Sequence, residues 1–436
     1  MTEAGALAGT LGPRYRRIFA AATISNLGDG VFVIALPLVA ADLTRDPRAI
    51  AGVMLALGLP WLVFALLAGA LVDRWDRRVV MVVADLIRGA LVGGLALAVA
   101  TDNHSMAMLY GVGFCLGMAE TMFDNASQTI LPSIVTDEQL LPRANGRLYA
   151  AETVTNQFIG PPLGGLLVAA AAAVPFWLDA ASFLAASALV ASIPGRFRGR
   201  PAAGGDEQTS RSLPAEIGEG LRWLWGHRLL RNLALLLGLL NMWATAGFAV
   251  MVLFAQEILG LDEVGFGLLL SCPAVGSLLG GLFTERLVAR IGTGPVIWFG
   301  CFGASLSVLL VAPFSTALVV GPVLGLMGLA GAAWNVVTVS LRQQIIPDHL
   351  LGRVNSVYRF LGWGSMPLGA LAGGLLADTF GLRAPFWIGG AILIVASAYF
   401  APGFTSANVA TAKSAAAKSA AAKSAATEAA ASASRA

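Results

Sequence analysis

The sequence predicts an all-α integral membrane protein, with twelve transmembrane helices in two six-helix pseudo-repeats. Three observations lead to this prediction: an apolar composition, apolar stretches of membrane-spanning length, and an internal repeat. Of the 436 residues, 57% are hydrophobic and only 12% are charged, whereas soluble domains carry about 25% charged residues. The mean hydropathy is +0.76. We therefore expect the lipid bilayer to be the main partner of the chain, and we expect no nucleic acid to bind.

The apolar stretches are long enough to cross a hydrocarbon layer of about 30 Å as helices. Helices are required because lipid offers no hydrogen-bond partner to a free backbone N–H. The first six predicted spans cover residues 18–41, 49–72, 79–100, 105–130, 148–173 and 176–194. The second six cover residues 229–258, 265–284, 295–313, 316–341, 354–378 and 384–401.

Polar segments divide the chain into five parts. Residues 1–17 precede the N-terminal bundle of residues 18–194, and residues 195–228 form a linker rich in Arg, Gly and Ser. The C-terminal bundle covers residues 229–403. Residues 404–436 form a tail with AAAKS repeats, and because it is low in complexity we expect it to have no apolar face to bury.

Basic residues are distributed unequally between the two sides of the predicted membrane. If the connections alternate between the sides, Arg45, Arg48 and Arg383 lie outside, and 25 of the 28 basic residues lie at or near the inner face. An excess of Lys and Arg is typical of the connections on the cytoplasmic side of a membrane protein. We therefore expect a bacterial inner-membrane protein with both termini in the cytoplasm. Its three cysteines lie in apolar stretches without a CxxC pair, so we expect no metal site.

The two predicted bundles resemble each other in sequence. VPFWLDAASFLAAS, residues 174–187, pairs with APFWIGGAILIVAS, residues 384–397, at an offset of 210 residues. LLPRAN at residue 140 pairs with LLGRVN at residue 350 at the same offset. Parallel repeats of this kind form transporters whose substrate site lies between the halves.

Two further motifs resemble those of the major facilitator superfamily. GALVDRWDRR, residues 69–78, is similar to its motif A, and GPPLG, residues 160–164, is similar to the core of its motif C, although Asn156 replaces an earlier glycine. With ISNLGDG in the first span and FWLDAASF in the sixth, the chain resembles the branch that contains enterobactin exporters and macrolide efflux proteins. The resemblance implies an exporter without a cofactor, and we expect the proton gradient to be its energy source.

The resemblance also implies roles for the motif residues. Motif A would form an inner gate, and Asp124 is expected to lie near its arginines; the alternative is a cluster that only sets topology. The gate residues are Gly69, Asp73, Arg74, Arg77, Arg78 and Asp124. In motif C, the residues Gly160, Pro161 and Gly164 are expected to bend the helix, although Gly and Pro are common in membrane helices anyway.

Ionisable residues within spans are candidates for proton coupling, because a charge inside the bilayer is costly unless it is paired or neutralised. Asp29 lies near the middle of the first span, and Glu120 lies on the fourth. A structural role, in which Asp29 only holds two helices together, is equally open. We expect Asp85 and Arg88 to pair with each other, and we expect Asp179 to lie near the outer face. We expect Glu152 and Arg359 to be structural, because they lie one to two turns inside the inner ends of their helices, where a long side chain can reach the membrane surface.

Uncharged polar and aromatic residues deep in the spans are candidates for the lining of an amphipathic substrate cavity. These are Asn26, Asn156, Gln157, Asn241, Trp243, Trp334 and Asn335. The alternative for each polar residue is a hydrogen bond between helices.

Four functions remain open: a proton-coupled exporter, an importer or symporter, a membrane sensor and a membrane-embedded enzyme. No Walker motif is present, which excludes direct use of ATP, and the scattered histidines and cysteines do not favour an enzyme. We expect a monomeric exporter of a small molecule such as a drug, a siderophore or a secondary metabolite.

Overall fold

The computed structural model describes residues 11–135, 137–195, 197, 213–415 and 418, and this part of the chain is helical, without a β-strand. The helices of the first half are α1 (Gly12–Leu43), α2 (Pro47–Arg74), α3 (Arg77–Ala100), α4 (Met106–Ile134), α5 (Leu141–Glu152), α6 (Gly160–Ala170) and α7 (Val174–Ala191). After α8 (Leu213–Gly226), those of the second half are α9 (Arg228–Ala249), α10 (Met251–Leu253), α11 (Glu263–Ile291), α12 (Thr293–Val311), α13 (Ala317–Ile345), α14 (Asp348–Trp363), α15 (Met366–Phe380) and α16 (Ala384–Phe400).

The predicted count of twelve spans is confirmed. In the described part of the chain, eleven helical stretches are long and apolar enough to cross a membrane. The fifth span is the exception, because it consists of α5, the π-helix η3 (Thr153–Ile159) and α6, with 12, 7 and 11 residues. These pieces follow one another without a gap, so together they form the twelfth span.

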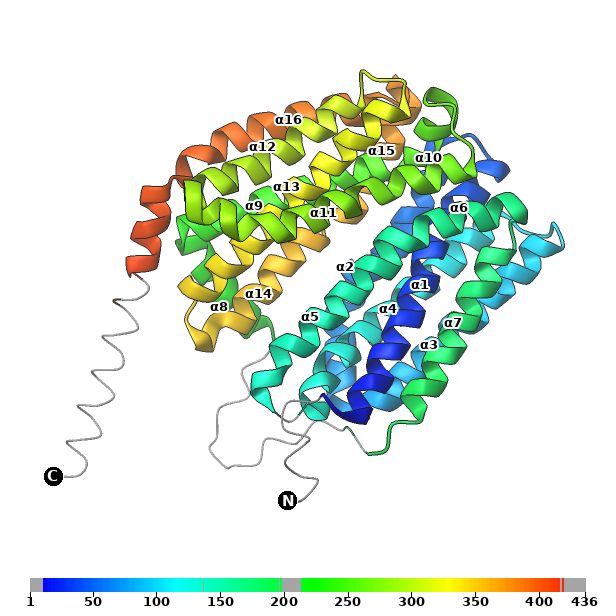
Figure 1. The fold of residues 1–436 in the computed structure, drawn as a ribbon, viewed down its shortest axis with the longest axis horizontal. Helices are drawn as coiled ribbons and strands as arrows, with labels where there is room; N and C mark the ends of the chain where they lie inside the picture. The colour runs from blue at the N-terminus through cyan, green and yellow to red at the C-terminus, as the bar shows by residue number, and fades with distance from the viewer. Residues whose placement is uncertain (1–10, 136, 196, 198–212, 416–417, 419–436) are drawn as a thin grey trace.

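Each half repeats the helix packing of the other. Within the first half α2 packs on α4, and α7 packs on α1 and α3; within the second half α11 packs on α13, and α16 packs on α9 and α12. The contacts between halves are paired in the same way, because α2 packs on α15 and α6 packs on α11. Figure 1 shows the two bundles side by side. The duplication inferred from the sequence is therefore present in the fold.

The apolar core is shared by the two halves at one end of the molecule and divided at the other. We call the end where α1 begins and α8 lies the linker end, and the opposite end the far end. At the far end, one cluster contains Phe32 of the first half and Phe254 of the second. At the linker end, a cluster around Tyr15 belongs to the first half alone and a cluster around Tyr358 to the second alone. The halves therefore pack together at the far end and separate at the linker end (Figure 1).

The expected linker contains a helix that packs on the second half. Helix α8 lies against α14, where Leu224 is fully buried and Glu219 pairs with Arg353 at 2.7 Å. The expectation that the tail buries no apolar side chain is wrong at its start. Residues 406–415 are helical, and Val409, 2% exposed, joins the apolar cluster of the second half.

Candidate functional site

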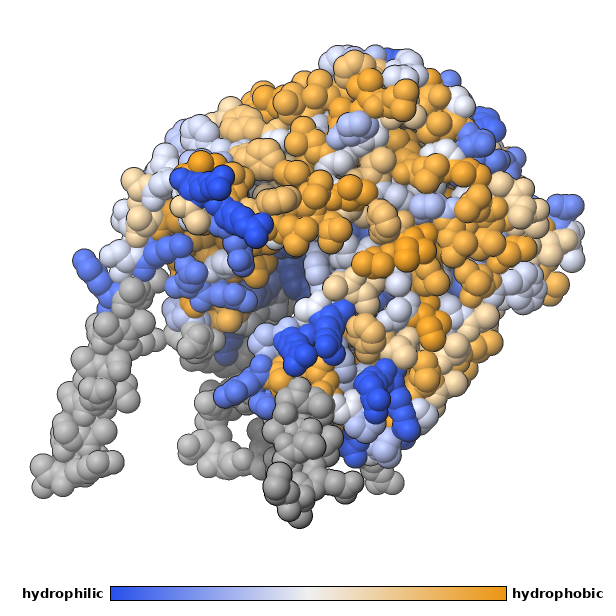
Figure 2. Space-filling model, viewed as in Figure 1, coloured by the Kyte–Doolittle hydropathy of each residue, from blue (hydrophilic) through white to orange (hydrophobic). Residues whose placement is uncertain are grey.

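Two adjoining cavities lie between the separated ends of the halves. The N-half cavity, of about 780 Å³, is lined mainly by α1, α4 and α5. The C-half cavity, of about 660 Å³, is lined mainly by α9, α13 and α14. Trp363 belongs to both walls, and Figure 2 shows the hollow between the halves from one side. A third, smaller cavity of about 380 Å³ lies closer to the far end, and we call it the far-end cavity.

Arg88 of α3 is the charge centre of the N-half cavity. Its guanidinium donates to Asp29 of α1 at 3.0 Å and lies 3.5 Å from Asp85. It also lies over the ring of Phe183, 4.1 Å from the centroid. Arg88 is 5% exposed and Asp85 is fully buried. The expected pairing of Asp85 with Arg88 is thus present, but Arg88 is shared with Asp29.

Further carboxyl groups surround this arginine. Four more acidic side chains line the same cavity: Glu120, Asp124, Glu152 and Asp179. One guanidinium cannot neutralise six carboxylates, and buried unpaired charges are unfavourable. The N-half cavity therefore favours bound protons or a cationic ligand.

The expected position of Asp179 near the outer face is wrong. Asp179 is 1% exposed, lines the N-half cavity and accepts from Ser182 Oγ at 3.3 Å. A Cβ at Gly28 of α1 would overlap both of these side chains. Gly28 thus allows α7 to bring its carboxyl group against α1.

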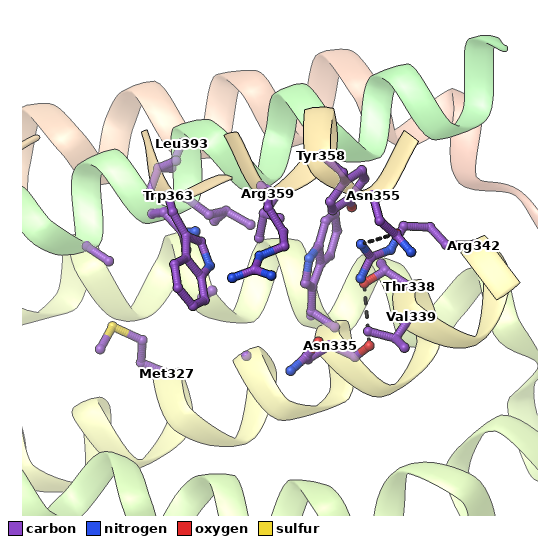
Figure 3. A pocket seen from close by; sticks show the side chains of 18 of the residues that line it. Met327, Asn335, Thr338, Val339, Arg342, Asn355, Tyr358, Arg359, Trp363 and Leu393 are labelled. Carbon is purple, nitrogen blue, oxygen red and sulfur yellow. Dashed lines mark hydrogen bonds between the residues drawn. The ribbon is translucent and has the colours of Figure 1, made fainter. Parts of the chain in front are cut away.

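The C-half cavity contains arginine and aromatic side chains, and no Asp or Glu is found among its described lining residues. Arg342 donates to Asn355 Oδ1 at 3.0 Å, and its guanidinium carbon lies 4.1 Å from the ring centroid of Tyr358. Arg359 lies over Trp363, 5.1 Å from the centroid. Figure 3 shows these side chains around one open space. The two cavities therefore differ in the sign of their charge.

Close backbone packing closes the far end. A Cβ at Gly165 of α6 would overlap the Glu263 carbonyl, and one at Gly267 of α11 would overlap the Pro161 carbonyl. Ser271 Oγ also donates to the Phe158 carbonyl across the halves at 3.3 Å. With the cavities open between the separated ends, the structure is that of a two-bundle protein open toward the linker end.

This geometry agrees with the comparisons with known proteins. The profile of the Major Facilitator Superfamily matches residues 18–366 and 234–433. The chain belongs to this superfamily. The multidrug efflux pump Tap of Mycobacterium tuberculosis is 31% identical over 394 residues, which cover 86% of this chain and 89% of Tap.

Two further comparisons agree with this assignment, one in sequence and one in fold. The enterobactin exporter EntS of Escherichia coli is 25% identical over 365 residues, which cover 83% of this chain and 85% of EntS. The solved structure of the nucleoside transporter NupG matches with a TM-score of 0.72 at 13% identity, and the match covers 90% of this chain and all of NupG (100%). The resemblance inferred from the motifs is confirmed, and the chain is a Major Facilitator Superfamily transporter.

Only part of motif A lies within the described side chains. Those of Gly69, Asp73 and Arg74 fall outside them. Arg77 donates to the Thr129 carbonyl at 3.0 Å and Arg78 to the Ile193 carbonyl at 2.6 Å. Both contacts stay within the first half, so the gating role remains a prediction.

Asp124 lies beside other acidic residues of the N-half cavity. It lines the N-half cavity with Glu120, one helical turn away, and its basic electrostatic neighbours are Arg88 and Arg359. Arg77 and Arg78 bind backbone carbonyls, and the side chain of Arg74 lies outside the described part of the chain, so the expected proximity of Asp124 to the motif A arginines stays a prediction. Asp124 belongs to the cavity wall.

The motif C run provides close packing. A Cβ at Gly160 would overlap Gly30 of α1, and one at Gly164 would lie 2.9 Å from the Val31 carbonyl oxygen. The π-helix η3 ends directly before Gly160. The departure from α-helical geometry therefore lies directly before the motif, whose own residues are α-helical, and the expected bend and its role in transport remain predictions.

The structure brings all the cavity candidates to cavity walls, and their contact with a substrate remains a prediction. Asn26 lines the N-half cavity, and Asn241, Trp334 and Asn335 line the C-half cavity. Gln157 and Trp243 line the far-end cavity, and Asn156 lines both this and the N-half cavity.

Sequence reasoning missed Arg342 and underrated Arg359. Arg342 lies one residue beyond the predicted tenth span, which ended at residue 341, whereas α13 continues to Ile345. Arg359 was expected to be structural because it lies near a helix end. A signal was available, because both are arginines on helices that continue past the apolar stretch.

Proposed function

We propose that this protein is a proton-coupled exporter that moves a small amphipathic molecule out of a bacterial cell by alternating access. The observation that carries the proposal is the set of five acidic side chains that line a cavity between the halves together with a single arginine, Arg88, which also pairs with the buried Asp85. The names of Tap and EntS describe export, and this similarity supports the outward direction.

The ion pair of Arg88 with Asp29 suggests how protons couple to transport. When a proton binds Asp29, the carboxyl group loses its charge and releases Arg88. Any stabilisation of the open state by this ion pair is then weakened. A cationic substrate group and a proton compete for the same carboxylates, so binding of one favours release of the other. A membrane potential of 100 mV contributes about 2.3 kcal/mol per charge, which is enough to drive export against a gradient.

The orientation follows from the basic residues. Arg45, Arg48 and Arg383 lie in far-end connections or at their edges, and the other basic residues of the described helices lie toward the linker end or within the bundles. By the positive-inside rule, this distribution supports a cytoplasmic position for the linker end and, with it, for both termini. The open cavities would accept substrate from the cytoplasm. The fold needs no partner chain to form them, in agreement with a monomer.

The experiment that tests the proposal uses purified protein in proteoliposomes, with norfloxacin as the transported probe and an imposed pH gradient. Asp29→Asn should lower the rate of gradient-driven transport at least tenfold, while exchange of the probe down its own concentration gradient continues. Asp102→Asn is the matched control, because Asp102 lies in a far-end turn with φ of 52°, which Asn tolerates.

Full gradient-driven transport by Asp29→Asn would exclude this residue as the coupling group. Asp29→Ala separates the structural alternative, because a residue that only holds helices together should lower the melting temperature when its side chain is removed. Accumulation of probe in the reverse direction would identify an importer.

A further inference from the structure

The two cavity walls at the centre of the molecule carry opposite charge, and this difference restricts the chemistry of the substrate. The N-half cavity is lined by five acidic side chains and Arg88. The C-half cavity is lined by Arg342 and Arg359, without an acidic residue among its described lining. We infer that the substrate is a zwitterion with an aromatic or otherwise apolar body, whose anionic group binds the two arginines and whose cationic group binds the carboxylates. This inference rests on the proposed export function and specifies its substrate class.

Buried donors without partners indicate that the C-half cavity accepts a ligand. Trp334 is 4% exposed and lines the cavity, and its Nε1 is buried without a hydrogen-bond partner. The same holds for Nε of Arg342. Buried donors in native proteins almost always have an acceptor. An anionic group in the cavity would bring acceptor atoms next to these two side chains, both of which line it.

The two guanidinium groups are held in place by aromatic rings, and their side-chain hydrogen bonds within the described part of the chain go to neutral groups. Arg342 lies over Tyr358 and binds the neutral side chain of Asn355. Arg359 lies over Trp363 and donates to Gln128 Oε1 at 3.2 Å. No ion pair of either arginine occurs among the described residues. A guanidinium packed on a ring keeps its edge free for a carboxylate, which it binds with two parallel hydrogen bonds.

Figure 3 shows the Arg359 guanidinium extending into the open space between Trp363 and Tyr358. Gln128, its partner, lines the N-half cavity. Arg359 and Trp363 therefore stand where the two cavities meet. A ligand with its anion at Arg359 has its apolar body against Trp363 and can reach the acidic wall with its other end.

The volumes fit one molecule that uses both walls. Cavities of about 660 and 780 Å³ are each within the range of about 300 to 1,000 Å³ found for sites of drug-sized ligands. A cation alone would leave both guanidinium groups unpaired, and an anion alone would leave the carboxylates without a counter-charge. A molecule with both charges satisfies the two walls together.

The test measures binding of three matched probes to the purified full-length protein at pH 7.5, without a gradient, by titration calorimetry. Norfloxacin carries a carboxylate and an ammonium group, its methyl ester keeps only the cation, and N-acetylnorfloxacin keeps only the anion. Norfloxacin should bind the wild-type protein most tightly. Each blocked derivative should bind about tenfold more weakly, the effect of losing one charge-assisted hydrogen bond.

Each variant should weaken the binding of only those probes that carry the charge its native residue binds. Arg342→Gln should weaken norfloxacin and N-acetylnorfloxacin about tenfold and leave the methyl ester unchanged. Glu120→Gln should weaken norfloxacin and the methyl ester but not the N-acetyl derivative. Arg286→Gln is the matched control, because Arg286 lies over Phe283 on an exposed face of α11, outside the cavities.

Because Arg342 also packs against Tyr358, a second arginine serves as a control for loss of this packing. If Arg342→Gln lowers the melting temperature, Arg359→Gln carries the test, because Arg359 is exposed to the cavity, and Arg359→Lys should restore part of the affinity. Equal weakening of all three probes by Arg359→Gln, tightest binding of the methyl ester, or no binding of any probe would each overturn the inference. Since no gradient is present, these outcomes are separate from loss of proton-driven transport, which would overturn the proposed function alone.

Discussion

Replacing Arg88 by glutamine should destabilise the protein strongly, because it leaves buried carboxylates without a counter-charge. Removing one partner of a buried ion pair costs about 3 to 5 kcal/mol. Asp85 is fully buried and bears this cost, whereas the side chain of Asp29 is 26% exposed to the cavity, where water screens its charge. We therefore expect a total loss of about 3 to 5 kcal/mol in the free energy of unfolding for Arg88→Gln, rather than twice that amount.

The loss should depend on pH. In the variant, the unpaired carboxyl group of Asp85 can avoid burying a charge by binding a proton, whereas in the unfolded chain it is ionised above about pH 4. The folded variant then binds more protons than the unfolded one, so its stability falls as pH rises. The slope is at most about 1.4 kcal/mol per pH unit for one proton. The destabilisation relative to wild type should therefore be larger at pH 9 than at pH 6.

Unfolding by SDS in mixed micelles, followed by tryptophan fluorescence at the two pH values, measures both effects. Arg286→Gln should change stability by less than about 0.5 kcal/mol, as an exposed substitution does. Adding Asp85→Asn to Arg88→Gln should recover part of the loss and reduce its pH dependence. An unchanged stability of Arg88→Gln at pH 9, or a loss of equal size at both pH values, would refute the electrostatic account.

Three further predictions concern topology, the inner gate and the closed far end. In intact cells, Asn103→Cys and Asp262→Cys should react with an impermeant thiol reagent added outside, and Gly205→Cys should not; labelling of the last would reverse the orientation. If the inner gate uses the Asp73 carboxylate in one state of a two-state equilibrium, Asp73→Asn should lower transport much more than protein abundance; wild-type transport would exclude the gating role. Gly267→Leu places a side chain against the backbone of α6 and should lengthen spin-label distances across the far end; unchanged distances would show that this contact does not hold the end closed.

The twelve spans could be predicted from the sequence because their physical cause is local. Each helix must satisfy its own backbone hydrogen bonds in lipid and must be long enough to cross it, so length and hydropathy decide where it lies. The ends of the helices are set differently, by packing and capping beyond the apolar stretch. Helix α13 continues four residues past its predicted end at residue 341, to Ile345, and Arg342 was missed for this reason.

The clustering of the site residues could be predicted only in part. Depth in the membrane identified Asp29 and Glu120, because depth follows from residue number along a helix. The approach of Asp179 to Gly28 depends on how α7 packs on α1, and spacing along the sequence contains no information about it. The same holds for Arg88, whose partner Asp29 is 59 residues away.

The internal repeat shows how the two halves share one fold and yet differ in the side chains at equivalent positions. At the offset of 210 residues, Asp179 in FWLDAASF aligns with Gly389 in FWIGGAIL. Each residue meets the first helix of its own half: Asp179 lies where Gly28 leaves space, and Gly389 leaves space for Trp243. At both places, a small residue on one helix faces a large residue on the other. In the first half the first helix carries the small residue, and in the second half it carries the large one. The same packing therefore places a carboxyl group at the N-half cavity and, in the other half, an aromatic ring at the far-end cavity, so equivalent positions of a duplicated scaffold carry different chemistry in the two halves.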